Sequence, residues 1–497
     1  MSKSLWFFHL LLLCLIISLT SCSMETPIVV ETAQPTQPDH LIKPTEPAKE
    51  TAQIIAIRPT QIELIPFDGS EEYPRPQYDF SVQLDMTNHH ISADQTISYT
   101  NNTGSTLADI PMIIPPAIYP NTIQLDQLTI LPESFNFTIQ NQDTDVYLQL
   151  EPALLPGQTI RIQIQFKLQI PYQEGAFGLT LRQLCLADWY PFIPPFLPER
   201  GWLINTPGTV GEYLAYPLND INLDLHVLPA EATYVIAASA PVLVQERNHY
   251  QYSAQNVRNF YLAISPEYQT ATAQSDRVTV MAYTFPEHQH LAERAAEIAQ
   301  SAWITFTEIY GPNERSFVSI VETDILDGLE GDGLFFLSSW YFKTADNTPM
   351  NYYELLVVHE VAHQWIYGMI YNDQAKEPWL DEALATYSEL LYYEIHYPEL
   401  VPWWWDFRVY EYDPIGMINA SIYEFDGYRP YVNTIYLQGV RFLESLRDTI
   451  GDEDFHAFLN AYVQLEDGDF RSTPRFFEIL DRITQKDYSA IKSQFFR

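Results

Sequence analysis

Apolar and polar residues alternate along much of the chain between about Tyr73 and Pro266. In the segment 161–170, every second residue is Ile, Phe or Leu, whereas Arg, Gln and Lys occupy the positions between them. A period of two is typical of a half-buried β-strand. The segments 78–84, 221–228 and 259–264 are further strands of this kind, and Pro, Gly and Asn separate them. The pattern predicts an N-terminal domain built as an antiparallel β-sandwich or saddle-like sheet.

After about residue 270 the spacing of apolar residues changes. Helical spacing predicts helices over 287–311, over much of 352–397, and within 436–462 and 473–480, with strands at 278–283 and 316–324. A chain of 497 residues is also too long for one ordinary hydrophobic core. We therefore expect a multidomain α+β chain, with a β domain at 61–270 and a mixed α/β domain at 271–497.

The first 22 residues have the features of an export leader. Lys3 precedes an apolar run from Leu5 to Leu19, which is shorter than a typical membrane-spanning helix. The run ends in Leu-Thr-Ser-Cys at Cys22, which resembles the bacterial lipobox. That resemblance implies a lipoprotein signal peptide at 1–22, exported and lipid-anchored through Cys22 to the outer face of the cell membrane or envelope. An ordinary signal peptide and an uncleaved anchor helix are the alternatives.

Residues 23–60 are rich in Thr, Pro, Glu and Gln and show no apolar period. Such a composition predicts a disordered tether rather than a domain.

The charge of the chain limits its partners. Its 64 acidic residues against 26 Lys and Arg give a formal net charge of -38. This excess excludes a nucleic-acid partner, because phosphates would meet no neutralising surface. Beyond Cys14 and Cys22 in the leader, Cys185 is the remaining cysteine of the sequence. The body of the chain must therefore be stabilised by packing rather than by disulfides.

The candidate chemistry lies in the second half of the chain, where His359-Glu360-Val361-Ala362-His363 falls in a predicted helix. Residues i and i+4 share one helix face, so both imidazoles can bind one zinc ion. A catalytic zinc takes three protein ligands, and Glu382 in a second helix is the candidate for the third. Glu360 is placed to act as a general base toward water. Glu389 is a candidate hydrogen-bond acceptor for a ligand histidine.

At these residues the sequence resembles the M1 family of gluzincin metallopeptidases, the aminopeptidase and leukotriene-hydrolase group. The segments HEVAHQW and WLDEALATYSE are similar to the family pattern of His-Glu-x-x-His, eighteen residues and Glu. The resemblance implies a thermolysin-like catalytic domain behind an N-terminal β domain, one Zn²⁺ per chain and peptide substrates. It also implies that Tyr436, before Gly439, stabilises the oxyanion, with Gln438 in place of the family's Lys.

The family's Gly-x-Met-Glu-Asn strand binds the free amine of the substrate through its Glu. The nearest match is Asp327-Gly328-Leu329-Glu330-Gly331, which lacks Met and Asn and makes Glu330 the candidate amine-binding residue. We expect an aminopeptidase that removes N-terminal residues from extracytoplasmic peptides. A zinc endopeptidase with an open cleft, or an inactive surface-tethered binding lipoprotein, are the alternatives. The sequence specifies no oligomeric state.

Overall fold

The computed structural model describes residues 75–142, 144–464 and 469–497. The predicted leader at 1–22, with Cys22, and the predicted tether at 23–60 lie outside the described residues. Within the described part of the chain, no helix combines the length and the apolar character needed to cross a bilayer.

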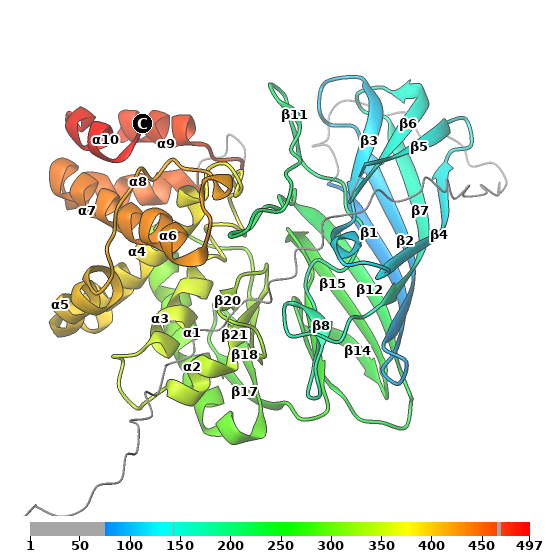
Figure 1. Ribbon diagram of the computed structural model, residues 1–497, viewed down its shortest axis with the longest axis horizontal. Coiled ribbons are helices and arrows are strands. Elements are labelled where there is room, and N and C mark those ends of the chain that lie inside the picture. The colour runs from blue at the N-terminus through cyan, green and yellow to red at the C-terminus, as the bar shows by residue number, and fades with distance from the viewer. Residues whose placement is uncertain (1–74, 143, 465–468) are drawn as a thin grey trace, which may run out of the picture. The chain divides into compact units, whose positions relative to one another are not determined.

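The alternating segments of the first half form the sheets of an N-terminal β domain (Figure 1). Within the described residues, the largest sheet has seven strands in the order β14 (Val242–Glu246), β15 (His249–Val257), β12 (Asn219–Leu228), β1 (Gln77–Asp85), β2 (His90–Thr100), β7 (Thr159–Gln169) and β4 (Ile123–Leu131). The residues of β7 alternate strictly between exposed and buried, so one face of the sheet covers the core and the other contacts solvent.

Three smaller sheets complete this half of the chain. They comprise β3 (Leu107–Ile113), β6 (Asp145–Leu154) and β5 (Asn136–Gln142); β13 (Val235–Ala238), β16 (Leu262–Ser265), β9 (Leu184–Leu186) and β8 (Phe177–Leu179); and the pair β10 (Phe196–Leu197) and β11 (Gly201–Trp202). Almost every strand pair is antiparallel, as expected. The exception in these sheets is β1, which pairs in parallel with β12 in the middle of the large sheet.

The second half combines a sheet with helices. Its five described strands are β17 (Gln269–Gln274), β18 (Thr279–Thr284), β19 (Phe317–Thr323), β21 (Leu334–Ser338) and β20 (Gly328–Leu329). The described α-helices are α1 (Gln289–Tyr310), α2 (Ser339–Thr344), α3 (Tyr352–Ala362), α4 (Trp379–His396), α5 (Val401–Trp404), α6 (Tyr428–Val432), α7 (Gln438–Ile450), α8 (Asp452–Gln464), α9 (Thr473–Ile483) and α10 (Ser489–Phe495).

The expected fold class, a β domain followed by a mixed α/β domain, is confirmed. The helix expected within 436–462 is divided, because Gly451 has φ of 87° and ends α7 before α8 begins. The predicted boundary at 270/271 falls within β17, the edge strand of the second sheet, and the exact boundary stays a prediction.

Arg258 joins the two halves at their junction. Its guanidinium is fully buried and donates to the backbone carbonyls of Tyr367 and Met369, which follow the α3 region. It also forms an ion pair with Asp469 at 2.8 Å. Five donors in one fixed plane allow a single arginine to bind several carbonyls at once. The loop after α3 is thereby fixed to the β domain.

Candidate functional site

Helix α3 carries both histidines of the motif, and it is buried on every side. Asn351 caps its N-terminus by accepting a hydrogen bond from the backbone N–H of Glu354. A helix that is apolar around its circumference belongs in a protein core, and α3 packs against α1 and α4. His363 follows the last helical residue with helical φ and ψ, so the i, i+4 relation to His359 is preserved.

Helix α4 brings Glu382 to the two histidines. The Oε2 atom of Glu382 lies 3.4 Å from Nε2 of His359 and 3.7 Å from Nε2 of His363. The two Nε2 atoms are 3.1 Å apart. All three residues are buried, and their ligand atoms lie within 4.8 Å of one another. The structure therefore brings together the three residues that the sequence selected.

The outer nitrogens of both imidazoles contact acceptors. Nδ1 of His359 lies 3.0 Å from Oε1 of Glu389, and Nδ1 of His363 lies 2.9 Å from Oδ1 of Asp381. An Nδ1–H that donates outward leaves Nε2 with a lone pair directed at the shared centre. Glu389 thus lies where an acceptor for a ligand histidine was expected. Nδ1 of His363 instead hydrogen-bonds the backbone carbonyl of Ile366 at 3.1 Å, with Asp381 as a close ionic contact.

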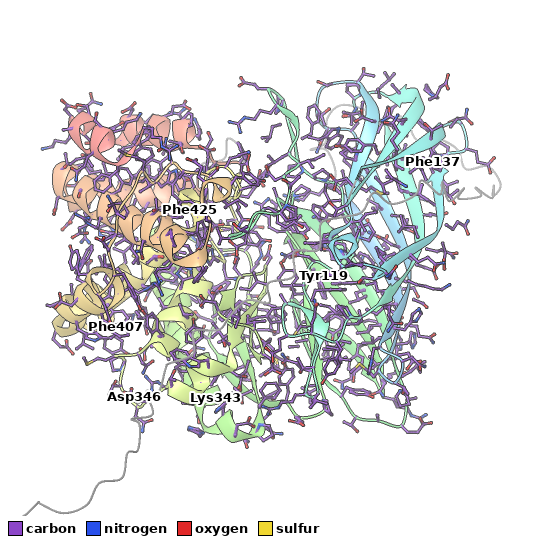
Figure 2. All side chains as sticks on the ribbon, viewed as in Figure 1. Tyr119, Phe137, Lys343, Asp346, Phe407 and Phe425 are labelled. Atoms are coloured by element: carbon purple, nitrogen blue, oxygen red, sulfur yellow. The ribbon has the colours of Figure 1, made fainter. Side chains whose placement is uncertain are left out.

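Arg408 holds Glu389 in turn through a bidentate contact at 2.9 and 3.0 Å. Burial alone would raise the pKa of Glu389, but the charge of Arg408 and the hydrogen bond from His359 keep it below its usual range. Arg408 lies on η4 (Trp405–Tyr410), a π-helical turn. Phe407 of the same turn, labelled in Figure 2, packs on Tyr352 of α3 with ring centroids 4.8 Å apart.

These donors fit a zinc ion. Two imidazole nitrogens and one carboxylate are a common ligand set for catalytic zinc. Donors ~2.0–2.1 Å from one ion at tetrahedral angles would be ~3.3–3.4 Å apart, close to the 3.1, 3.4 and 3.7 Å found here. A neighbouring group, Glu330, His363 and Asp381, also places three ligand atoms close together. This group shares His363 with the first set, and the Nδ1 atom of His363 that lies next to Asp381 is already hydrogen-bonded to the carbonyl of Ile366. The set with Glu382 is therefore the better zinc site.

Glu360 lies beside this centre without belonging to the ligand set. Burial raises the pKa of its carboxyl to about 8, against the opposing charges of the two histidines. Its Oε2 atom is buried and has no hydrogen-bond partner among the described residues. Gly328 in β20 makes room for it, because a Cβ there would lie 2.0 Å from Oε1 of Glu360. A free carboxylate oxygen next to the metal ligands suits a general base.

Tyr436 also reaches the centre. Its ring stacks on His359 with centroids 6.1 Å apart, and its hydroxyl contributes a hydrogen bond that lowers the pKa of Glu382. It lies in η6 (Asn433–Leu437), a π-helical turn that leads into α7. Gly439 lets α7 approach α4 closely, since a Cβ there would meet the Cβ of Ala383 at 2.4 Å. This close approach positions Tyr436 over the three candidate ligands.

The site opens into a cleft of about 410 Å³. Its acidic and basic lining residues are Glu212, Asp327, Glu330, Glu360, Glu382, Arg408 and Arg429. Desolvation, together with the charges of Glu382 and Asp381, outweighs the charge of His363 and raises the pKa of Glu330 to about 7. Burial and neighbouring carboxylates likewise raise the pKa of Glu212. Carboxylates held together in this way gain from a cation bound between them.

Four further residues of this site were not predicted from the sequence. Glu212 comes from the loop between β11 and β12, and Gln374 holds both Glu330 and Asp381 through its amide nitrogen. Asp381 directly precedes Glu382 in the motif, so its position next to the candidate ligands could have been predicted from the sequence. Glu212, Gln374 and Arg408 lie outside the motif, and no local spacing connects them with it.

Residues 321–495 match the family model described as the Peptidase family M1 domain. This segment is an M1 peptidase domain. It contains all three candidate ligands as well as Glu360 and Tyr436. Within it, Glu382 of α4, Glu360 of α3 and Tyr436 of η6 lie around one centre.

Two curated relatives align with part of the chain. Aminopeptidase 2 of Candida albicans is 28% identical over 134 residues, which is 26% of this chain and 14% of that protein. Human glutamyl aminopeptidase is 27% identical over 121 residues, or 22% of this chain and 12% of that protein. The chain thus aligns with less than a sixth of the length of either relative.

Solved structures resemble most of the chain. The M1 zinc metallopeptidase of Deinococcus radiodurans has a TM-score of 0.58 at 17% identity, covering 82% of this chain and 90% of that one. A mutant of the same enzyme bound to the substrate Tyr-Ser-Ala has a TM-score of 0.59 at 18% identity, covering 85% and 94%. At this identity the likeness establishes the fold, in which a β-rich domain precedes the M1 peptidase domain.

Zinc binding to the M1 domain is expected to release protons at neutral pH. Burial lowers the pKa of His359, but hydrogen bonds with Glu382 and Glu389 outweigh it and raise the pKa to about 9. In the metal-free chain at pH 7 the imidazole is therefore protonated, and ligation requires loss of that proton. The apparent affinity for zinc should rise as the pH increases toward about 9. Calorimetric titration in buffers of different ionisation enthalpy measures the release, and an affinity independent of pH would contradict it.

Proposed function

We propose that this chain is a zinc-dependent aminopeptidase that removes N-terminal residues from extracytoplasmic peptides. The observation that supports the proposal is the convergence of His359, His363 and Glu382 beside the unpartnered carboxylate of Glu360 in an acidic cleft. One Zn²⁺ held by these ligands would act as a Lewis acid toward the scissile carbonyl and toward water.

Two residues next to the centre would carry out proton transfer and stabilisation of the oxyanion. Glu360 accepts a proton from the attacking water through its free Oε2 and returns it to the leaving amine. Tyr436 donates its hydroxyl hydrogen to the negative charge that develops on the carbonyl oxygen. Burial and nearby carboxylates raise the pKa of this phenol well above its usual value, so it keeps the proton that this role needs.

The acidic pocket supports the proposed preference for substrates with a free amine. Glu330 directly follows β20, whose Gly328 lies against Glu360, and Glu212 approaches from the β domain. Each carboxylate is costly to bury without a counter-charge, as the raised pKa values show. The ammonium of a peptide N-terminus supplies that charge only when its first residue occupies the pocket. This arrangement favours an aminopeptidase over an endopeptidase.

The test compares aminoacyl chromogenic substrates that have a free amine with the same compounds blocked at nitrogen. We expect turnover of the free-amine substrates, loss of turnover after zinc is removed by a chelator, and recovery when Zn²⁺ is added. Turnover of blocked peptides alone would instead identify an endopeptidase. No turnover of either, with zinc bound, would favour a binding lipoprotein.

We further propose that the protein is exported and lipid-anchored through Cys22. The apolar run ending in Leu-Thr-Ser-Cys supports this proposal. In a bacterial host, a tagged fatty acid is expected to label the full chain and to be absent from a Cys22→Ser variant. Equal labelling of both chains would reject the anchor.

A further inference from the structure

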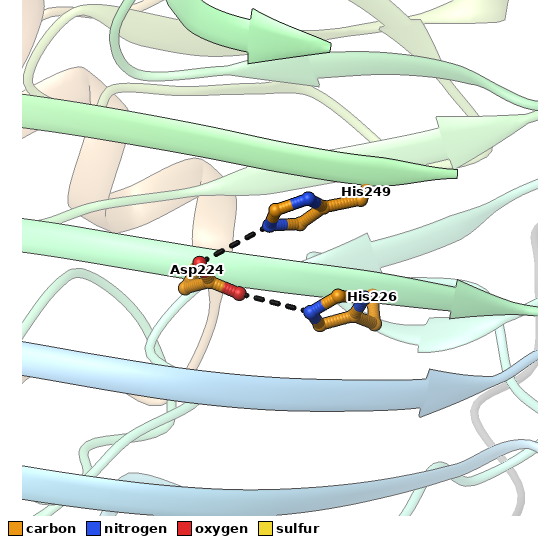
Figure 3. A group of neighbouring side chains, drawn as sticks. All are labelled: Asp224, His226 and His249. Atoms are coloured by element: carbon orange, nitrogen blue, oxygen red, sulfur yellow. Dashed lines mark hydrogen bonds and ion pairs between the residues drawn. The ribbon is translucent and has the colours of Figure 1, made fainter. Parts of the chain in front are cut away.

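A second group of metal-ligating side chains lies on the solvent face of the seven-stranded sheet (Figure 3). Asp224 and His226 lie two residues apart on β12, so both side chains are on the same face. The strand pairing places His249 of β15 directly opposite His226. Their side chains are between 28% and 51% exposed, so a dissolved ion can reach them.

The three side chains converge closely. Nε2 of His226 lies 3.1 Å from Oδ1 of Asp224, and Nε2 of His249 lies 3.1 Å from Oδ2 of the same carboxylate. The two imidazole rings are parallel within 3°, with centroids 4.2 Å apart. All three ligand atoms lie within 4.8 Å of one another. Two donors ~2.1 Å from a common ion at roughly right angles are ~3.0 Å apart, close to the two contacts of 3.1 Å.

The geometry suits a shared cation. Each imidazole directs its Nε2 atom at a different oxygen of the same carboxylate, so three potential ligand atoms face one point. A divalent cation satisfies both neutral imidazoles and the carboxylate together. Gln251, opposite Asp224, donates to Oδ2 at 2.7 Å and so fixes the carboxylate. This hydrogen bond also contributes to the lowered pKa of Asp224, which keeps it anionic.

We propose that Asp224, His226 and His249 bind a late first-row divalent transition-metal cation, with Zn²⁺ as the probe. Two imidazoles and a carboxylate suit this class of ion better than Ca²⁺ or Mg²⁺, which prefer oxygen ligands alone. Glu246 of β14 is the register partner of His249 and adds a carboxylate to the same face of the sheet. The ion would connect β12 to β15 and thereby stabilise the β domain.

The test counts zinc bound to the full chain after equilibrium dialysis. We expect about two ions per wild-type chain, about one in His249→Gln, about one in Glu382→Gln, and none in the double variant. His290→Gln changes an exposed histidine at the start of α1 and should keep about two. If the catalytic proposal fails while this one holds, Glu382→Gln will bind as much zinc as the wild type, whereas His249→Gln will still lose an ion.

A second measurement separates binding from folding. Zn²⁺ should raise the unfolding temperature of Glu382→Gln, and this rise should disappear when His249→Gln or Asp224→Asn is added. Asp224→Asn preserves the size of the side chain, so it serves if His249→Gln alters the circular dichroism spectrum. The proposal is overturned if both variants, in the Glu382→Gln background, bind zinc as Glu382→Gln alone does.

Discussion

A Glu360→Gln variant is expected to bind zinc as the wild type does while losing roughly 10²- to 10⁴-fold in kcat. The amide keeps the shape of the carboxylate but cannot accept a proton from water. Since Glu360 does not belong to the three converging ligands, its replacement leaves the metal site intact. Metal analysis and steady-state hydrolysis of an aminoacyl substrate, performed on the same preparation, measure both parts of the prediction.

Tyr436→Phe provides the matched comparison, because it removes one hydroxyl next to the same centre. It should also reduce kcat, by roughly 10²- to 10³-fold, but without removing the base. The pH dependence separates the two roles. The acidic limb of the rate profile, which reports deprotonation of Glu360, should persist in Tyr436→Phe. Unchanged turnover in Glu360→Gln would show that another group activates water.

A Glu330→Gln variant is expected to lose kcat/KM for free-amine substrates by roughly 10- to 100-fold, the value of a charge-assisted hydrogen bond. Any slow turnover of nitrogen-blocked substrates should be unaffected, because these have no ammonium to bind. Steady-state kinetics on the matched pair of substrates measures this difference. A Glu212→Gln variant should act in the same direction, since both carboxylates line the cleft.

Stability distinguishes this effect from misfolding. Glu330 has a folded pKa of about 7, above the ordinary value of 4.5, so its charge destabilises the fold increasingly as pH rises between these values. Replacement by Gln should therefore leave the unfolding temperature at pH 8 equal or higher. Glu399→Gln, at an exposed position, controls for a general effect of charge removal. Equal losses on free and blocked substrates would reject Glu330 as an amine-binding residue.

The convergence of His359 and His363 could be predicted from the sequence because its geometry is local. Two histidines four residues apart converge whenever the segment is a helix, and the apolar spacing around His359 predicts that helix. The need for glycine at positions 328 and 439 cannot be predicted from local residue spacing. Each is required because another element approaches it closely, Glu360 in one case and Ala383 in the other.

The remaining parts of both sites depend on long-range pairing. Glu212 enters the cleft from a loop of the β domain, and Arg408 reaches Glu389 from a π-helical turn that no periodicity marks. His249 meets His226 only through the register of β15 on β12. A shift of two residues would leave both histidines on the same face but no longer opposite each other, and alternation alone does not exclude such a shift.

The most direct test of the zinc centre is an anomalous difference map, recorded at the zinc edge from crystals of the full chain. The account predicts a peak ~2.0–2.2 Å from Nε2 of His359, Nε2 of His363 and a carboxylate oxygen of Glu382. A peak between Glu330, His363 and Asp381 instead, or zinc-dependent hydrolysis with no peak at Glu382, would contradict it.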